Sequence, residues 1–287
     1  MILVTGAAGK TGRAVVRALA AGRQPVRALI HRPEHAPGLR ALGAAEAPAA
    51  DLRDGAAVER AAHGVRAVYH IAPNVSPDEI AIGRNIIAAA QSAGVERLVY
   101  HSVLHPHVEA MPHHWQKARV EELLFASGLA FAILQPTAYM QNIAAAWEAI
   151  TARGRYPVPY SPEARLSLVD LEDVAQAAAR VLAEPGYAGA TIEVVGTPGI
   201  TPRQIAATLS AELGRPVEAE LVPLEAWKAG ARASGLGDYS ILALARMFIY
   251  YNDHGLVGSP RALASVLGRP PTSLEAFIRR MVQERSS

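Results

Sequence analysis

The first fifteen residues carry three glycines at a spacing that suits phosphate binding. Gly6, Gly9 and Gly12 follow the apolar run 2–5, and a helical pattern covers residues 11–21. A strand, a glycine turn and a helix bring free backbone N–H groups and the positive end of a helix macrodipole to one point, which favours a diphosphate. Gly6 would permit the turn, Gly9 the approach of the diphosphate, and Gly12 the packing of helix on strand. We predict a dinucleotide site, although an ordinary turn could carry the same glycines.

Cationic side chains follow the second predicted strand, residues 25–30. An NAD site usually places an acid about twenty residues past the glycines, to hold the ribose 2′-OH. This chain has His31 and Arg32 there, and arginine suits a 2′-phosphate through charge-assisted bonds. Lys10, inside the glycine turn, could add a second charge, whereas Glu34 or a merely solvated Arg32 would leave NAD possible. We expect NADP(H) to be preferred over NAD(H).

Asp51 and Leu52 end the third predicted strand, residues 43–50. A carboxylate at that point could meet an adenine amino group. The alternative, an aspartate that starts the helix predicted over 54–62, fits the sequence equally well.

Five histidines, with few acids, lie close together in the sequence, from the end of a predicted strand to the start of a predicted helix. His101, His105, His107, His113 and His114 fall within fourteen residues, with Glu109 as the only nearby acid. Zinc needs a fuller ligand set than this. We therefore predict no metal and interpret the segment as a polar loop at the edge of a cleft.

Alternating strands and helices must position these residues. Predicted strands cover 2–5, 25–30, 43–50, 65–71, 97–102, 130–135 and 191–195, and predicted helices cover 11–21, 54–62, 78–93 and 114–127. This alternation predicts an α/β fold of the Rossmann type, a doubly wound parallel sheet with helices on both faces. The expected strand order is 3-2-1-4-5-6, with the segment 191–195 as a further strand.

The alternation breaks after residue 136. We expect a helix over 139–153, a loop over 157–162, a strand and helix over 166–183 that return to the sheet, and a capped helix over 201–213. Asp170 and Asp173 are interpreted as helix-capping acids. From residue 224 the chain reads as helical. We predict a nucleotide domain of residues 1–142 with 166–196, and a smaller, mostly helical substrate lobe of 143–165 with 197–287 over the carboxyl edge of the sheet.

Composition excludes several classes of function. The chain has 287 residues, 51% of them hydrophobic and 19% charged, with a net charge of +2 and no cysteine. Disulfides, thiolate zinc sites and cysteine nucleophiles are therefore excluded. The basic residues are scattered, so we expect no nucleic-acid partner. No apolar stretch approaches the ~20 residues of a membrane span, and a strand beginning at residue 2 leaves no room for a signal peptide. We expect no membrane association and a cytoplasmic protein.

Eight segments resemble one known family. They are VTGAAGKTG (4–12), LIHRP (29–33), DL (51–52), RLVYHSVLHP (97–106), HHWQKARVEELL (113–124), SGLAFAILQPTAYMQN (127–142), VDLEDVA (169–175) and LGRPPTSLEAFI (267–278). In this order they are similar to the NmrA-like branch of the atypical short-chain dehydrogenase/reductases. The resemblance implies that the loop 6–12, including Ala8 and Thr11, holds the diphosphate. It implies that His31 and Arg32 contact the 2′-phosphate and that Asp51 and Leu52 contact the adenine. It also implies that Ala72 and Pro73 lie near the nicotinamide and that Lys117 contacts the nicotinamide ribose.

The chain departs from the superfamily at the position of the proton donor. Short-chain dehydrogenases use a Tyr-x-x-x-Lys pair, but His113 stands four residues before Lys117. Ser102 lies near the usual serine position, and Gln135-Pro136 replaces a common Arg-Pro. A histidine can supply a proton near neutral pH, so His113 is the first candidate donor. Tyr139 and His101 are the reserves, and His113 could instead be a merely exposed residue at a helix start.

Polar and aromatic residues could form a substrate pocket. The candidates are Asn74, His101, Ser102, Tyr139, Asn142, Trp147 and Tyr250, with Phe248 and Tyr251 nearby. Aromatic bodies with polar tips suit an aromatic or amphipathic small molecule, but the same residues would also suit the core of the small lobe.

These observations lead to two functional hypotheses. The first is an NADPH-dependent reductase of a small carbonyl, quinone or conjugated compound. The second is a non-catalytic NADP(H) sensor that acts through a regulatory protein partner, which some proteins of this type are. Isomerase or lyase chemistry on the same fold is a third possibility. A small-molecule substrate is the expected partner, and a homodimer is compatible with the sequence.

Overall fold

The computed structural model describes residues 1–286 and divides into two compact units. Unit 1 comprises Met1–Val108, His114–Pro136 and Val174–Ile192. Unit 2 comprises Glu109–His113, Thr137–Asp173 and the chain from Glu193 onward. Each unit is therefore assembled from segments far apart in the sequence, so the two are interwoven along the chain.

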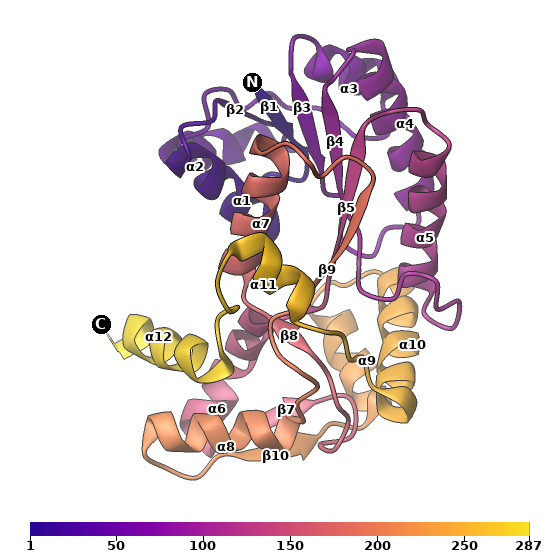
Figure 1. The fold of residues 1–287 in the computed structure, drawn as a ribbon. Helices are drawn as coiled ribbons and strands as arrows, with labels where there is room; N and C mark the ends of the chain where they lie inside the picture. Colours follow the sequence, from indigo (N-terminus) through magenta and orange to yellow (C-terminus); the bar gives the residue numbers. More distant parts are fainter. Residues whose placement is uncertain (287) are drawn as a thin grey trace. The chain divides into compact units, whose positions relative to one another are not determined.

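A six-stranded sheet forms the centre of unit 1 (Figure 1). Its strands are β1 (Ile2–Val4), β2 (Val26–Ala28), β3 (Ala67–His70), β4 (Arg97–His101), β5 (Phe131–Pro136) and β9 (Ala190–Val194). The order is β2-β1-β3-β4-β5-β9, and β1 pairs in parallel with β2 and β3, as does β4 with β3 and β5. The predicted α/β class and the predicted order of these six strands are confirmed.

The predicted strand over 43–50 is wrong as a strand. The segment lies beside β2, as the predicted order requires, but it forms only two isolated bridges, Arg27 to Glu46 and Ile30 to Ala49. Ala28 donates to the Glu46 carbonyl and Ile30 to the Pro48 carbonyl. Pro48 has no N–H to donate between these bonds, so the ladder is interrupted.

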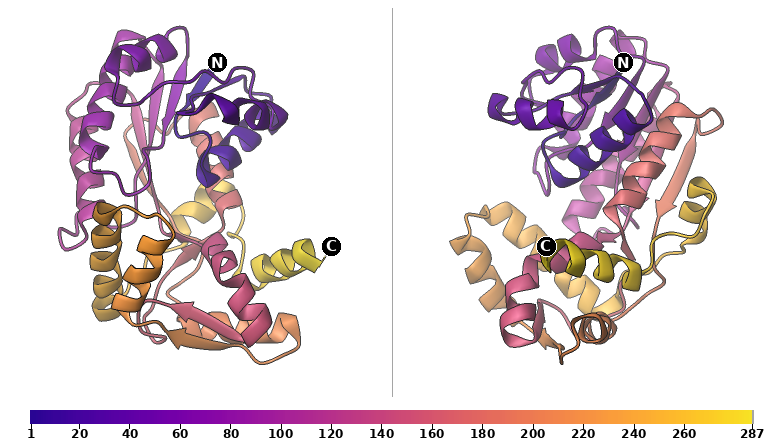
Figure 2. Two further views of the ribbon diagram at one scale, coloured as in Figure 1. Left: turned by 180° about the vertical axis from the view of Figure 1, so that it is seen from behind. Right: turned by 90° about the vertical axis from the view of Figure 1, so that its left-hand side faces the viewer.

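Helices cover both faces of the sheet in unit 1 (Figures 1 and 2). α3 (Gly55–Ala62), α4 (Glu79–Ser92) and α5 (Pro112–Phe125) lie on one face, and α1 (Lys10–Ala21) with α7 (Leu171–Ala183) on the other. The short helices η1 (Pro33–His35) and α2 (Ala36–Ala41) follow β2. Aliphatic side chains of α4 and α5, including Ile82, Ile86 and Leu124, pack on the sheet in one buried cluster. The apolar side chains of α4 thus face the sheet, although Ile80 is only partly buried.

Unit 2 contains two small parallel sheets and most of the remaining helices. β6 (Ala138–Tyr139) pairs with β8 (Leu168–Val169), and β7 (Arg155–Val158) pairs with β10 (Glu218–Leu221). The helices are η2 (Met140–Ala146), α6 (Trp147–Arg153), α8 (Pro202–Leu213), α9 (Leu224–Ala233), α10 (Asp238–His254), α11 (Arg261–Leu267) and α12 (Leu274–Ser286). α8 packs on the β7–β10 pair and also against α12. The helical C-terminal portion is confirmed, as is the cap of α8, where Thr201 and Gln204 form a capping box.

Several predictions for unit 2 need correction. The strand predicted near residue 166 does not join the large sheet, since β8 pairs with β6 instead. β7 occupies part of the predicted loop 157–162, and the predicted helix 139–153 begins as the 3-10 helix η2. Isolated two-stranded pairs leave little periodic signal in sequence, because their register depends on a distant partner.

Asp170 and Asp173 do more than cap a helix. Asp170 accepts a bond from the Glu172 amide at 3.1 Å, which agrees with the capping interpretation. Both carboxylates are also buried and paired with arginines near the C-terminus, Asp170 with Arg280 at 2.7 Å and Asp173 with Arg269 at 2.6 Å. Among residues 1–286, no helix is long and apolar enough to cross a membrane.

Candidate functional site

The glycine turn after β1 is built for close backbone approach. Gly6 has a positive φ of 59°, and a Cβ there would lie 2.7 Å from the Ile71 carbonyl oxygen. A Cβ on Gly12 would lie 2.4 Å from the Gly6 carbonyl oxygen, so only glycine lets α1 begin against the turn. Gly9 is exposed, and the nearest atom to a Cβ there would be 3.4 Å away. The fold therefore requires Gly6 and Gly12, whereas Gly9 is exposed and a Cβ there would make only an ordinary van der Waals contact.

The first turn of α1 fits an anion. Gly9 is the N-cap of α1 and supplies no side-chain hydrogen bond to it. The turn also lacks acidic residues, so the partial positive charge at the helix start is not neutralised from within the helix. Ala8 and Thr11 lie on either side of Gly9 and Lys10, and their contact with a dinucleotide stays a prediction.

The predicted cations near the second strand are exposed. Lys10 and Arg32 lie at the surface, and within residues 1–286 neither has an acidic partner. His31 and Glu34 are exposed as well. Sequence reasoning missed a third cation, Arg13, whose guanidinium lies so close to Gly38 of α2 that a Cβ there would be 3.3 Å from Nη1. Its signal in the sequence is the spacing of three from Lys10 along α1.

Asp51 keeps its charge beside Arg53. The Arg53 guanidinium donates to Asp51 at 2.7 and 3.1 Å, and this hydrogen bonding lowers the pKa of the Asp51 carboxyl to about 2. Asp54, and not Asp51, caps α3 by accepting from the Ala57 amide at 3.1 Å. The helix-starting alternative for Asp51 therefore fails, and the carboxylate is available as an acceptor. Leu52 packs against the core of unit 1.

The end of β3 is fastened to the end of β1. Thr5 Oγ1 accepts from the Ile71 amide at 3.0 Å and lies 2.8 Å from His70 Nδ1. Beyond this point Ala72 is buried, while Pro73 and Asn74 are exposed. The segment predicted to lie near a nicotinamide therefore leaves the sheet immediately after a fixed anchor.

Lys117 lies in a buried polar cluster. Its side chain is 7% exposed and that of Glu79 is 0% exposed, with 3.0 Å between Nζ and Oε1. Nζ also donates to the His101 carbonyl at 3.1 Å, and Tyr100 Oη donates to the same Glu79 oxygen at 2.8 Å. Glu79 was not among the predicted site residues, because in sequence it reads as an ordinary acid in the first turn of a helix.

His101 and Ser102 are buried at the end of β4. His101 Nδ1 lies 2.7 Å from Tyr69 Oη, and burial lowers the pKa of the His101 ring to about 3. A neutral ring of that kind is a poor proton donor near neutral pH. Ser102 donates to Glu121, which also accepts from Gln135 at 3.0 Å. As substrate contacts, both residues stay predictions.

The other histidines of this region do not gather around one point. His113 is partly buried in the first turn of α5, four residues before Lys117. His114 is buried, and burial lowers its pKa to about 4. The rings of His105 and His107 lie 6.2 Å apart. Within residues 1–286 no group of three potential ligands could hold a metal ion.

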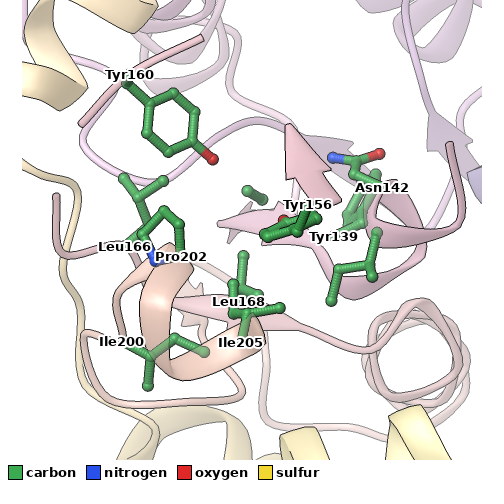
Figure 3. A pocket seen from close by; sticks show the side chains of 11 residues that line it. Tyr139, Asn142, Tyr156, Tyr160, Leu166, Leu168, Ile200, Pro202 and Ile205 are labelled. Carbon is green, nitrogen blue, oxygen red and sulfur yellow. The ribbon is translucent and has the colours of Figure 1, made fainter. Parts of the chain in front are cut away.

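Tyr139 and Asn142 share a small cavity in unit 2 (Figure 3). Its volume is about 40 Å³, and Tyr156 and Tyr160 line it together with aliphatic residues such as Leu168 and Ile205. This space suits a water molecule or the edge of a ring rather than a whole substrate. The structure therefore brings together two of the predicted substrate residues.

The remaining predicted substrate residues lie elsewhere in unit 2. Trp147 packs against the core of that unit, and the Arg285 guanidinium lies 5.3 Å from its ring. Tyr250 contacts the His254 ring at 4.7 Å. Phe248 and Tyr251 contact Tyr160, at 5.9 and 6.0 Å between ring centroids. This aromatic cluster thus adjoins the cavity through Tyr160, and Tyr251 is buried in it.

Comparisons with known proteins identify the family of the chain. The model of the NmrA-like family matches residues 1–278. The chain is 31% identical to the NAD(P)H azoreductase of Xenophilus azovorans over 286 residues, 96% of each chain. It is 28% identical to quinone oxidoreductase 2 of Escherichia coli (strain K12), again over 96% of each chain. The crystal structure of an NADPH-dependent quinone oxidoreductase from Escherichia coli complexed with NADPH is similar, with a TM-score of 0.86 and 28% identity over 98% of this chain and 100% of the other. The chain belongs to the NmrA-like family.

Proposed function

We propose that this protein is an NADPH-dependent oxidoreductase that reduces a small carbonyl, quinone or conjugated compound. The observation that carries the proposal is the turn after β1. Its outer glycines are required by packing, whereas the exposed Gly9 begins a helix without a side-chain cap, followed directly by exposed Lys10, and Arg32 is exposed as well. The similarity to an NAD(P)H azoreductase and to a quinone oxidoreductase supports this assignment.

Residues of unit 1 would bind the cofactor. The backbone amides at the start of α1 donate hydrogen bonds to the diphosphate, and Arg32, aided by Lys10 and Arg13, donates to the 2′-phosphate. The Asp51 carboxylate accepts a bond from the adenine amino group, and Leu52 packs beside it. Ala72 and Pro73 border the nicotinamide half, and Lys117 donates to its ribose. NADPH, when bound, supplies the hydride.

The protein must also supply a proton to the reduced acceptor. His113 is the first choice, since it is partly exposed and lies one helical turn before Lys117 on α5. Tyr139, beside a cavity in unit 2, is the second. His101 ranks last, because burial lowers the pKa of its ring to about 3, and the resulting neutral ring is a poor proton donor near neutral pH.

An aromatic acceptor fits the residues available in unit 2. Tyr139 and Asn142 offer a hydroxyl and an amide at the edge of an otherwise apolar cavity, next to the ring of Tyr160. A planar quinone or an aromatic azo compound could place a ring edge there and meet polar groups at its rim. A homodimer remains a prediction, which light scattering on the purified protein would test.

A titration of NADPH and NADH by cofactor fluorescence tests the cofactor assignment. We expect NADPH to bind at least about tenfold more tightly, a difference of about 1.4 kcal/mol. Arg32→Ala should remove most of that preference by weakening NADPH and sparing NADH. Arg40→Ala, which removes an exposed arginine of α2 that carries no proposed role, is the matched control. Equal affinities for both nucleotides would exclude Arg32 as the 2′-phosphate contact.

A panel of quinones, azo dyes and aldehydes, followed by NADPH consumption, tests turnover. We expect acceptor-dependent oxidation, and His113→Ala should lower kcat by about 10²-fold if His113 is the proton donor. Unchanged turnover in His113→Ala would move the role to Tyr139. Tight NADPH binding without any turnover would instead support the sensor hypothesis and its regulatory protein partner.

A further inference from the structure

The ion pair between Glu79 and Lys117 is buried on both sides. Neither side chain is more than 7% exposed, and both belong to unit 1, Glu79 at the start of α4 and Lys117 in α5. Two charges removed from water lose their hydration, so such a pair is a weak source of stability compared with apolar residues of the same size. Its presence at the end of β4 therefore suggests a role other than stability.

The hydrogen bonds around Lys117 fix the direction of its ammonium. A lysine ammonium has three N–H donors. One points to Glu79 Oε1 at 3.0 Å and a second to the His101 carbonyl at 3.1 Å. Within residues 1–286 no third acceptor is found for Nζ, so one N–H remains for a ligand. The Tyr100 ring, whose centroid lies 5.2 Å from Nζ, closes one side of this arrangement.

Glu79 is held in place by the same cluster. Its Oε1 also accepts from Tyr100 Oη at 2.8 Å, whereas its buried Oε2 has no partner in the described part of the chain. Burial raises the pKa of Tyr100 well above its usual value, with a contribution from Glu79. Tyr100 therefore stays a neutral donor, and the carboxylate is shared between one neutral and one charged donor.

Among residues 1–286, no other group gives Lys117 a negatively charged hydrogen-bond acceptor. Burial, reinforced by the nearby ammonium, lowers the pKa of His70 and of His101 to about 3 and that of His114 to about 4, so these rings are neutral near pH 7. Glu121, whose pKa burial raises, is bonded to Ser102 and Gln135 instead. Glu79 is thus the carboxylate in direct contact with the ammonium.

We propose that Glu79 is a positioning residue that holds Lys117 charged and oriented, with one N–H free for the cofactor ribose or the substrate. This proposal rests on the proposed reductase function for what Lys117 touches. The hold of Glu79 on Lys117 is a property of unit 1 alone and can be measured without cofactor.

The substitution Glu79→Gln keeps the shape and removes the charge. The amide oxygen can accept from Lys117 and Tyr100, and the amide nitrogen takes the place of the unpartnered Oε2. Tyr100→Phe is the matched control, because it removes a bond to the same oxygen and leaves both charges in place. Glu79→Asp is the conservative variant, which restores the charge on a shorter stem.

The first readout is NMR of protein labelled with ¹³C-lysine and without cofactor. The chain has only three lysines, Lys10, Lys117 and Lys228, and the Cε signal of Lys117 is assigned by its loss in Lys117→Arg. In Glu79→Gln we expect this signal to titrate at a pH at least about one unit lower than in the parent, since a buried ammonium without a counter-charge loses its proton more readily. Tyr100→Phe should behave like the parent, and Glu79→Asp should fall between the two.

The second readout is the pH profile of NADPH-dependent turnover. Glu79→Gln should lose at least about tenfold in kcat at the alkaline end and recover part of it toward pH 6, with KM for the acceptor little changed. An unchanged Lys117 titration together with an unchanged pH profile would overturn the proposal. If the Lys117 signal titrates at lower pH in Glu79→Gln but the parent protein turns over no acceptor, the positioning role of Glu79 is supported and only the reductase function is contradicted.

A third test compares the double variant Glu79→Gln/Lys117→Gln with the single variant Lys117→Gln. If Glu79 acts only through Lys117, adding Glu79→Gln to Lys117→Gln should not lower kcat beyond the value for Lys117→Gln alone. A further loss of tenfold or more in the double variant would contradict a role exerted through Lys117.

Discussion

The two units bury their acidic side chains in different ways. In unit 1 both members of the Glu79–Lys117 pair are out of water, at 0% and 7% exposure. In unit 2 Asp170 and Asp173 are buried, but their partners Arg280 and Arg269 are 33% and 42% exposed. A half-exposed arginine keeps much of its hydration, so the pairs in unit 2 lose less on burial.

The difference in exposure matches a difference in what the two kinds of ion pair connect. Arg280 lies on α12, and Asp170 also accepts from Gln141 at 2.7 Å, so this aspartate ties the C-terminal helix to the segment that follows β6. Asp173 similarly accepts from the Thr272 amide at 2.6 Å. The pair in unit 1 ties together two neighbouring helices that already share an apolar core. We infer that the pairs in unit 2 serve the fold, whereas the pair in unit 1 serves the site.

The largest expected effect is the acid sensitivity of unit 1. His70, His101 and His114 have pKa values of about 3, 3 and 4 when folded, against 6.5 in an unfolded chain. Below pH 6.5 these histidines therefore bind protons in the unfolded state but not in the folded state. The free energy of unfolding consequently falls as pH falls from about 6.5 toward 4. Each ring contributes about 1.4 kcal/mol per pH unit in that window, so the three together contribute about 4 kcal/mol for each pH unit.

Tryptophan fluorescence can follow each unit during acidification. Trp115 lies in unit 1, and Trp147 and Trp227 lie in unit 2. In a Trp147→Phe/Trp227→Phe variant the remaining signal should change between about pH 6 and 4, whereas Trp115→Phe should report a transition at lower pH. Simultaneous transitions above pH 5 in both variants would mean that the units do not differ in this respect.

The next largest effect is expected from breaking the pair in unit 1 on one side. Lys117→Met leaves the Glu79 carboxylate buried without its cation, so the free energy of unfolding should fall by about 3–5 kcal/mol. Lys117→Met/Glu79→Gln removes both charges and should recover most of that loss. Urea unfolding of the two variants measures the difference, and equal destabilisation would show that the charge of Glu79 is not the cause.

A smaller effect is expected from the pair that fastens α12. Asp170→Asn keeps the volume but weakens the bonds to Arg280 and Gln141, so we expect a loss of about 2 kcal/mol with NADPH affinity unchanged. Glu172→Gln, which alters the more exposed acid on the same arginine, is the matched control and should cost under about 0.5 kcal/mol. A loss of NADPH affinity in Asp170→Asn, with little loss of stability, would reverse the roles assigned to the two kinds of pair.

The smallest effect belongs to the surface. Arg279 and Glu212 form an ion pair at 2.9 Å with the arginine 60% exposed. Arg279→Ala should change the free energy of unfolding by no more than about 0.5 kcal/mol, and 1 M salt should abolish even that. A loss above 1 kcal/mol that persists in high salt would show that this exposed pair contributes as much stability as a buried one.

The sequence predicts the geometry of the nucleotide turn well because that geometry is local. Gly6 needs its positive φ and Gly12 its missing Cβ within one turn of chain, and such requirements leave a direct mark on residue type. The strands of the large sheet are also predictable, since buried parallel strands are continuously apolar. The pairing of β7 with β10 is not, because β10 is mostly exposed and contains two glutamates.

The polar contacts of the candidate site depend on tertiary structure. Glu79 has the sequence pattern of an exposed first-turn acid, and only the packing of α4 on α5 buries it against Lys117. Arg13 has the pattern of a solvated helix residue, and only the path of α2 brings Gly38 next to its guanidinium. Asp54 rather than Asp51 is the helix cap, a difference of three residues that propensity alone does not resolve.

Steady-state oxidation of NADPH and NADH with a quinone acceptor measures both the turnover and the cofactor preference of the protein. We expect acceptor-dependent oxidation of both cofactors, with kcat/KM at least about tenfold higher for NADPH, equivalent to about 1.4 kcal/mol. Tight NADPH binding with no oxidation by any quinone, azo or carbonyl acceptor would contradict the assignment as a reductase.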